Sequence, residues 1–100
     1  MIMYIVAEGA AVRDADDCGR LHLQTDLDPD GLRAALTATG SGEFVGGDTA
    51  LLDLGVLRAR AELVAAAPDW AQRWTAMVDH AERGGRLSPD GRSVQVNVQR

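Results

Sequence analysis

The fold is decided most clearly by residues 68–84, PDWAQRWTAMVDHAERG, and by the turn and strand that follow them. At 100° per residue, the large apolar side chains of this stretch fall within one arc of about 100°, which predicts an amphipathic helix packed on a core. Pro68 suits the first helical turn, and the glycine pair at 84–85 ends the helix. The members of the arc are Trp70, Trp74, Met77, Val78 and Ala81.

A β-hairpin is predicted directly after this helix. Residues 88–91, SPDG, are typical of a tight turn. The residues that follow alternate between valine and neutral polar side chains, the pattern of a strand with one buried face. The valines are Val94, Val96 and Val98, and the polar residues are Gln95, Asn97 and Gln99.

The N-terminal part predicts two strands. Residues 2–7 are apolar on both faces, which indicates a central strand or a strand covered by a second subunit. Residues 9–19 are interpreted as a polar connection. Residues 21–27 alternate with leucines inward, as in a half-buried strand. We expect these two strands to form a hairpin with a long loop.

The middle of the chain predicts two further helices. Asp28 is a suitable N-cap, because its carboxylate accepts from free backbone N–H groups, and Pro29 fits the next position. This helix ends at Gly40. A short strand is predicted at 49–54 and a second helix at 55–66, so that only a short break separates it from the tryptophan helix.

These elements predict a single α+β domain over residues 1–100. It contains an N-terminal β-hairpin, three helices and a C-terminal β-hairpin, in the order β-β-α-β-α-α-β-β. From the first helix onward, this order is similar to that of winged-helix domains, and the resemblance implies a DNA-binding use. The exposed side of the tryptophan helix, however, carries as much negative as positive charge, which equips it poorly for phosphate contacts.

The composition narrows the classes of partner. A net charge of −5 argues against nonspecific binding to nucleic acid or to an anionic membrane. The chain has no membrane-spanning apolar segment and no secretion signal, so we expect a cytoplasmic protein. The lack of lysine suggests a bacterial, GC-rich genome. Charge is uneven: residues 1–54 carry three arginines against ten acids, and residues 55–100 seven against five. Such asymmetry favours association with a partner or a second copy.

Arg60 is the first candidate for a binding residue. On the predicted second helix it lies between apolar residues, and a buried guanidinium needs a partner because an uncompensated buried charge costs several kcal/mol. The simplest partners are a carboxylate from the acidic N-terminal half, or water reached by bending the side chain to the helix edge. The alternative is an anionic ligand or a partner's carboxylate, which suits the planar fork of arginine.

Two other groups resemble metal or catalytic sites only in part. Asp26, Asp28 and Asp30 match the opening of a calcium loop, but Thr37 stands where such a loop places its glutamate, so a helix start is the simpler interpretation. Cys18 and His22 are four residues apart, and a zinc or catalytic site would require the fold to bring His80 across. The sequence therefore predicts no metal and no cofactor.

Three functions remain open, and the first is a small soluble protein-interaction or accessory module that forms a homodimer. Its expected interface residues are Val56, Leu63, Trp70 and Trp74. The second is a small cofactor-independent enzyme, an isomerase or cyclase, with Glu8, Tyr4 and His22 as candidate catalytic residues and a pocket between sheet and helices. The third is the winged-helix DNA binder.

The polar residues of two predicted strands favour a contact surface. If the strands at 21–27 and 93–99 are neighbours, their outward side chains form a neutral, hydrogen-bonding sheet face that contacts a partner, a substrate or water. These side chains are His22, Gln24, Gln95, Asn97 and Gln99.

Overall fold

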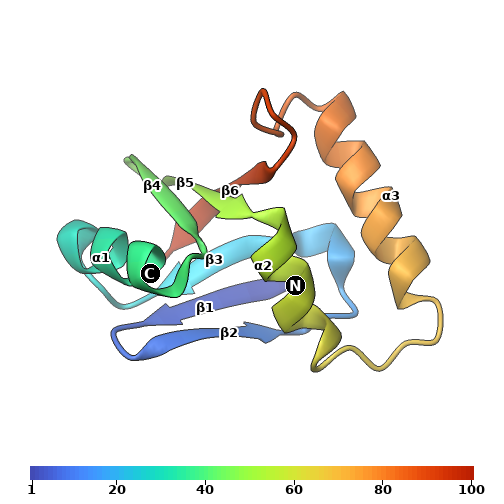
Figure 1. The fold of residues 1–100 in the computed structure, drawn as a ribbon, viewed down its shortest axis with the longest axis horizontal. Helices are drawn as coiled ribbons and strands as arrows, with labels where there is room; N and C mark the ends of the chain where they lie inside the picture. The colour runs from blue at the N-terminus through green and yellow to red at the C-terminus, as the bar shows by residue number, and fades with distance from the viewer.

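The computed structural model describes all 100 residues and contains three α-helices and a six-stranded mixed sheet, which confirms the predicted α+β class. In Figure 1, α1 and α2 lie across the sheet and α3 lies beyond one end of it. The helices are α1 (Pro29–Thr39), α2 (Leu54–Glu62) and α3 (Trp70–Arg83), and a 3₁₀ turn, η1, covers Cys18–Arg20. The strands are β1 (Ile2–Val6), β2 (Gly9–Arg13), β3 (His22–Thr25), β4 (Gly42–Gly46), β5 (Thr49–Asp53) and β6 (Ser93–Gln99).

The sheet has the strand order β2-β1-β3-β6-β5-β4. Its centre is parallel, because β1 pairs with β3 and β3 with β6 in the same direction. Each side ends in an antiparallel hairpin, β1–β2 on one side and β5–β4 on the other. Strand β6, the last in the sequence, therefore joins the two halves of the sheet.

The predicted N-terminal hairpin is present, but its second strand is β2 and not residues 21–27. A tight turn at Ala7 and Glu8 returns the chain at once, and Gly9 pairs with Val6. The chain then runs back through η1, so that β3 lies parallel to β1 on its other side. The expected polar connection at 9–19 thus contains an edge strand.

The predicted C-terminal hairpin is present only in part, because its first strand is reduced to a single β-bridge. Leu87 pairs with Val94 across the turn, and Ser88 donates its backbone N–H to the carbonyl of Ser93. The carboxylate of Asp90 holds the turn by accepting from the Ser88 hydroxyl and from the Arg92 N–H. Beyond this turn, β6 separates from the segment around Leu87 and enters the centre of the sheet.

The core lies between the sheet and the helices on one of its faces. Met3, Ile5 and Leu23 point from the central strands into this layer and are fully buried. They meet Leu36 of α1 and Leu57 of α2, which are equally buried. Full burial of one such side chain stabilises the fold by about 1.5–3 kcal/mol. The three valines of β6 face the same layer, as their alternation predicted.

The tryptophan helix is confirmed as α3, with its predicted stripe turned inward. Trp70 and Trp74 are 6% and 5% exposed, and their ring centres lie 5.6 Å apart. The indole N–H of Trp70 donates to the carbonyl of Ala15, 2.7 Å away, which ties α3 to the segment before η1. Both rings are buried by this chain's own residues, so neither offers a partner the interface surface expected of it.

The three helices do not form the compact cluster typical of winged-helix domains. The order of elements that suggested the resemblance is present, from α1 through β4, β5, α2 and α3 to β6. However, α1 and α2 each contact the sheet, and α3 contacts η1. The strands meanwhile form one six-stranded sheet in place of a two-stranded wing. None of the three helices is long and apolar enough to cross a lipid bilayer.

Candidate functional site

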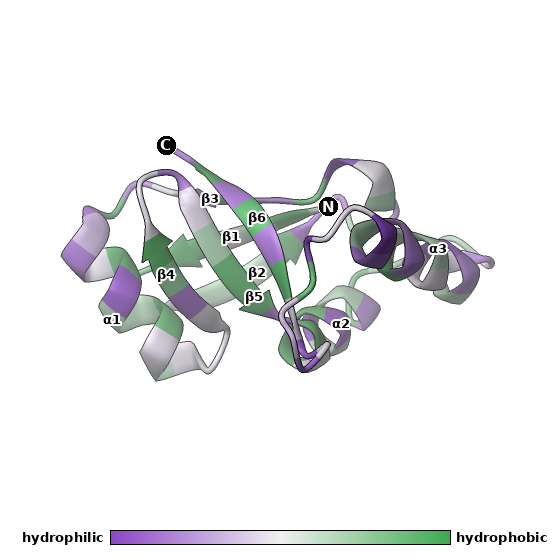
Figure 2. Cartoon of the chain, turned by 90° about the horizontal axis from the view of Figure 1, so that it is seen from above, coloured by the Kyte–Doolittle hydropathy of each residue, from purple (hydrophilic) through white to green (hydrophobic).

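One broad face of the sheet carries no helix. Figure 2 shows α1 and α2 on the same side of the sheet, while the opposite side is uncovered. We call this uncovered side, formed by the outward-pointing residues of the six strands, the open face. Side chains alternate along each strand, so the residues that stand between the buried ones point to the open face. Its central members are Tyr4, His22, Gln24, Leu51, Gln95, Asn97 and Gln99.

The centre of the open face is polar and uncharged, as the sequence predicted. Strands β3 and β6 are neighbours, and Gln24 pairs in register with Gln99 on one side and with Tyr4 on the other. Asn97 pairs with Thr49 of β5. Amide side chains both donate and accept hydrogen bonds, so this surface can bind another surface of the same kind.

The two edges of the open face carry opposite charges. On the β2 edge, Arg13 pairs in register with Ile2, and its guanidinium carbon lies 4.6 Å from the centre of the Tyr4 ring. On the β4 edge, Glu43 pairs with Leu51, whose partner on β6 is Gln95. Both charged residues are exposed. The face is therefore positive on one edge, neutral in the middle and negative on the other edge.

His22 lies on the open face and not beside a nucleophile. Its Nδ1 atom is 3.1 Å from the carbonyl of Arg20, a contact within its own segment. Cys18 is buried, 8% exposed, and its thiol donates to the carbonyl of Ala15. Burial also raises the pKa of this thiol. The two residues that sequence spacing placed together thus have separate surroundings.

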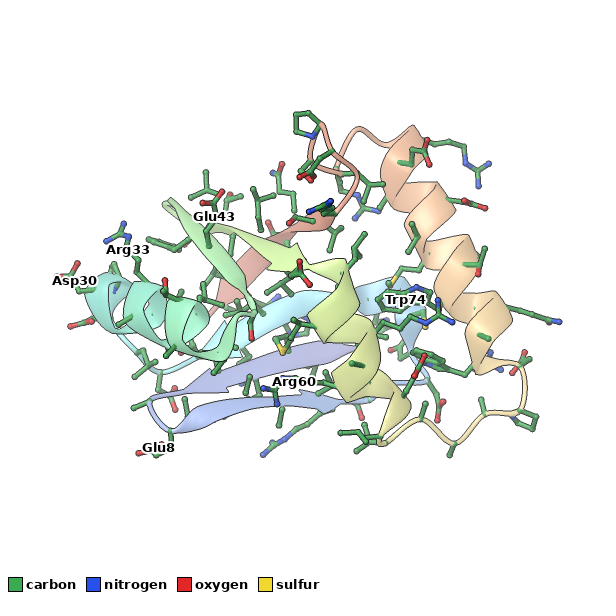
Figure 3. The ribbon with its side chains drawn as sticks, viewed as in Figure 1. Glu8, Asp30, Arg33, Glu43, Arg60 and Trp74 are labelled. Atoms are coloured by element: carbon green, nitrogen blue, oxygen red, sulfur yellow. The ribbon has the colours of Figure 1, made fainter.

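The candidate catalytic residues Tyr4 and Glu8 do not converge with Arg60 on a pocket. Tyr4 points to the open face, whereas Arg60 belongs to α2 on the covered side. Glu8 is exposed at the turn between β1 and β2, and Figure 3 shows it at the outer end of this hairpin, pointing away from Arg60. None of them lines the cavity that lies against α3.

Arg60 finds a partner that the sequence did not suggest. Its Nη1 atom donates to the main-chain carbonyl of Ala10 on β2, 2.8 Å away. Its Nε atom is buried without a hydrogen-bond partner. The guanidinium therefore connects α2 to the edge strand, and neither a carboxylate nor an anion is needed to hold it there.

The remaining predicted interface residues lie at the two ends of α2. Val56, at its start, is half-buried, and Leu63, just after its end, is 84% exposed. The predicted helix to residue 66 stops at Glu62, because the Asp16 carboxylate accepts from the backbone N–H groups of Ala66 and Ala67 and draws the chain away. Leu63 and Val64 are thereby left on the surface.

The aspartates of the calcium-like stretch act at the start of α1. Asp28 is the N-cap and accepts from the N–H of Gly31 at 2.7 Å. Asp30 makes an exposed ion pair with Arg33, 3.4 Å away, and both lie on α1 in Figure 3. No group of three histidine, cysteine, aspartate or glutamate side chains in the chain is arranged to hold a metal ion.

A cavity that the sequence did not predict lies against α3. It has a volume of about 410 Å³ and opens between α3, η1 and the turn before β6. Cys18 and His80 both line it, so the fold does bring His80 across to the cysteine's side of the molecule. We call it the α3 cavity. The residues that line it come from segments between Asp16 and Val94. Of these segments, only α3 had a sequence pattern, its apolar stripe, that indicated a buried surface here.

Comparison with known proteins identifies no relative of this chain. No protein-family model, no curated protein and no solved structure matches this chain.

Proposed function

We propose that this chain is a small interaction module that forms a homodimer by packing its open face against the open face of a second copy. The observation that carries the proposal is the order of charges across that face: Arg13 on one edge, neutral amides in the middle and Glu43 on the other edge. Two such faces complement each other when one is turned over the other.

The symmetry of the proposed dimer follows from this order. A twofold axis parallel to the strands, passing between β3 and β6, places the β2 edge of one copy over the β4 edge of the other. Arg13 then lies over the partner's β4 edge, which carries Glu43, at both rims. A twofold axis across the strands would instead place Arg13 over Arg13, and like charges in such an interface are unfavourable.

The chemistry of the middle of the face supports the same arrangement. Near the axis, Gln24 and Asn97 would face amides of the partner, and each amide can serve as donor or acceptor. Ile2, Tyr4 and Leu51 are half-buried in the single chain and would supply apolar contact. Two stacked sheets with interdigitating side chains lie about 10 Å apart, at a small angle set by their twist.

The proposal is tested by measuring mass against concentration with sedimentation equilibrium. We expect a species of about twice the 10.6 kDa chain. Either Arg13→Glu or Glu43→Arg weakens association by about tenfold, since each places like charges at both rims. The double variant restores it, because the two charges are exchanged. Arg33→Glu, on α1 and away from the open face, is the matched control and leaves association unchanged.

Two outcomes would refute the proposal. A monomer at every concentration up to the millimolar range rules out self-association. A dimer that persists in Gln24→Arg, which places charge in the middle of the face, shows that another surface forms the contact. In that case Leu63→Ala becomes the informative variant, since Leu63 is the most exposed of the large apolar side chains.

A further inference from the structure

The α3 cavity has the form of a ligand site. Its volume of about 410 Å³ lies within the range of about 300–1,000 Å³ found for small-molecule pockets. Its interior is apolar, formed by Leu21, Leu54, Met77, Leu87 and Val94. Met77 adds adaptability, because an unbranched thioether repacks easily around different shapes. No residue of the open face lines it, so it is separate from the surface proposed for association.

The acidic residues beside the cavity are already engaged. The Asp16 carboxylate accepts from the backbone N–H groups of Ala66 and Ala67, at 3.1 and 3.0 Å. The carboxylate of Asp17 lies 3.9 Å from Nε of Arg20, on the exposed side of η1. Each of these two carboxylates thus has a hydrogen-bonding or ionic partner within the chain.

The basic residues are only partly compensated. Arg73 donates through Nε to Asp69 at 3.1 Å and through Nη1 to the carbonyl of Asp16 at 3.3 Å. Arg86 has a fixed backbone, with its N–H bound to Ala81 and its carbonyl to Gln95. Its guanidinium, however, makes no hydrogen bond and no ion pair within the chain. A cavity of an acidic protein thus presents a free arginine at its border.

We propose that the α3 cavity binds a small organic acid with an apolar body, whose carboxylate is held by Arg86 and whose hydrocarbon part lies against Met77 and Leu54. A planar guanidinium pairs with a carboxylate through two parallel hydrogen bonds, which fixes the orientation of the ligand as well as its charge. The neutral thiol of Cys18 belongs to the apolar wall of the cavity and makes no ionic contact with the ligand.

The binding is tested by titrating the 100-residue chain with decanoate, below its micelle concentration, and following backbone amide shifts by NMR. We expect saturable shifts confined to α3, η1 and the turn at 84–92. Decanol, which lacks the charge, and decylamine, which reverses it, are compared at the same concentrations. The expected order of affinity is decanoate, then decanol, then decylamine.

Two variants locate the site, with one matched control. Arg86→Gln weakens decanoate binding by about tenfold but leaves decanol unchanged, since it removes one charged hydrogen-bonding partner. Ala76→Phe fills the cavity and abolishes binding of both. Arg83→Gln, one turn away on α3 and outside this cavity, changes neither.

Three results would overturn the inference. Absence of saturable decanoate binding rejects the site, and equal affinity for decanoate and decylamine rejects the role of the arginine. Unchanged decanoate affinity in Arg86→Gln, with the protein folded, likewise rejects that role. Each result is independent of the oligomeric state, so the inference and the proposed dimer fail or hold separately.

Discussion

The guanidinium of Arg60 on α2 donates to the carbonyl of Ala10 on β2, fifty residues earlier and 2.8 Å away, while its own Nε is buried without a partner. One hydrogen bond thus anchors the helix to the edge strand, and one buried donor remains unpaired. A buried unpaired donor costs about 1–3 kcal/mol, which offsets much of the gain from the bond.

The first prediction concerns this offset. Arg60→Met keeps the packed stem and removes the unpaired donor, so its free energy of unfolding stays within about 1 kcal/mol of the wild type. Arg60→Ala also removes the stem and loses about 1–3 kcal/mol. Urea denaturation measures both. A loss in Arg60→Met as large as that in Arg60→Ala would show that the charge itself is required, as an anionic occupant would demand.

The second prediction concerns Gly42 at the start of β4. This residue has φ of 153°, and a Cβ atom there would lie 1.9 Å from the carbonyl oxygen of Leu51. Gly42→Ala therefore destabilises the fold by about 3 kcal/mol or more, because two backbones must separate. Gly9→Ala is the control, since nothing lies within 4 Å of its Cβ position. Thermal melts distinguish them, and equal melting temperatures would contradict the close approach of β4 and β5.

The third prediction compares two leucines in and just after α2. Leu57 is 0% exposed and Leu63 is 84% exposed. Leu57→Ala leaves a cavity in the core and costs about 2–5 kcal/mol. Leu63→Ala changes stability by less than about 0.5 kcal/mol. A large loss in Leu63→Ala, measured by denaturation at several protein concentrations, would reveal a contact between copies at this residue.

The fourth prediction is a pH dependence from Cys18. Burial raises the pKa of its thiol in the folded chain, so between the ordinary thiol value and the raised value the unfolded chain has released more protons. This contribution to stability is fully present below about pH 8 and falls as the pH rises through that window. Cys18→Ser removes the fall. Parallel urea curves of the two proteins at alkaline pH provide the measurement, and identical slopes against pH would contradict the prediction.

The fifth prediction separates a helix cap from a calcium site. Asp28→Ala loses the cap of α1 and about 1 kcal/mol of stability, whereas Asp28→Asn retains most of it. Added Ca²⁺ leaves the melting temperature of the wild type unchanged, because Asp28 has no further carboxylates arranged with it to hold the ion. A rise in melting temperature with Ca²⁺ that is lost in Asp28→Asn would restore the calcium interpretation.

The elements with strong local patterns were predictable from the sequence. The stripe around Trp74 required a helix, and the alternation around Val96 required a strand with one buried face. In both cases the chain buries the predicted side. The cap at Asp28 was equally readable, because its interaction is complete within three residues.

What was missed depends on contacts between distant segments. Strand β2 has one β-branched residue, Val12, beside three small residues and Arg13, and it is a strand because the turn at Ala7 and Glu8 places it beside β1. The carbonyl that meets Arg60 belongs to that same strand, so its partner could not be foreseen. The α3 cavity combines Cys18, Leu54, Met77 and Leu87, which no local pattern relates.

The position of β6 has a consequence for how the protein is made. Strand β6, residues 93–99, is synthesised after the other five strands, yet it lies between β3 and β5 and pairs with both. Until they emerge, the nascent chain holds two separate half-sheets, each with an unpaired strand edge, a common template for aggregation. The sheet is therefore completed only once β6 has left the ribosome, and ribosome stalling before residue 93 would leave a chain that requires chaperone protection.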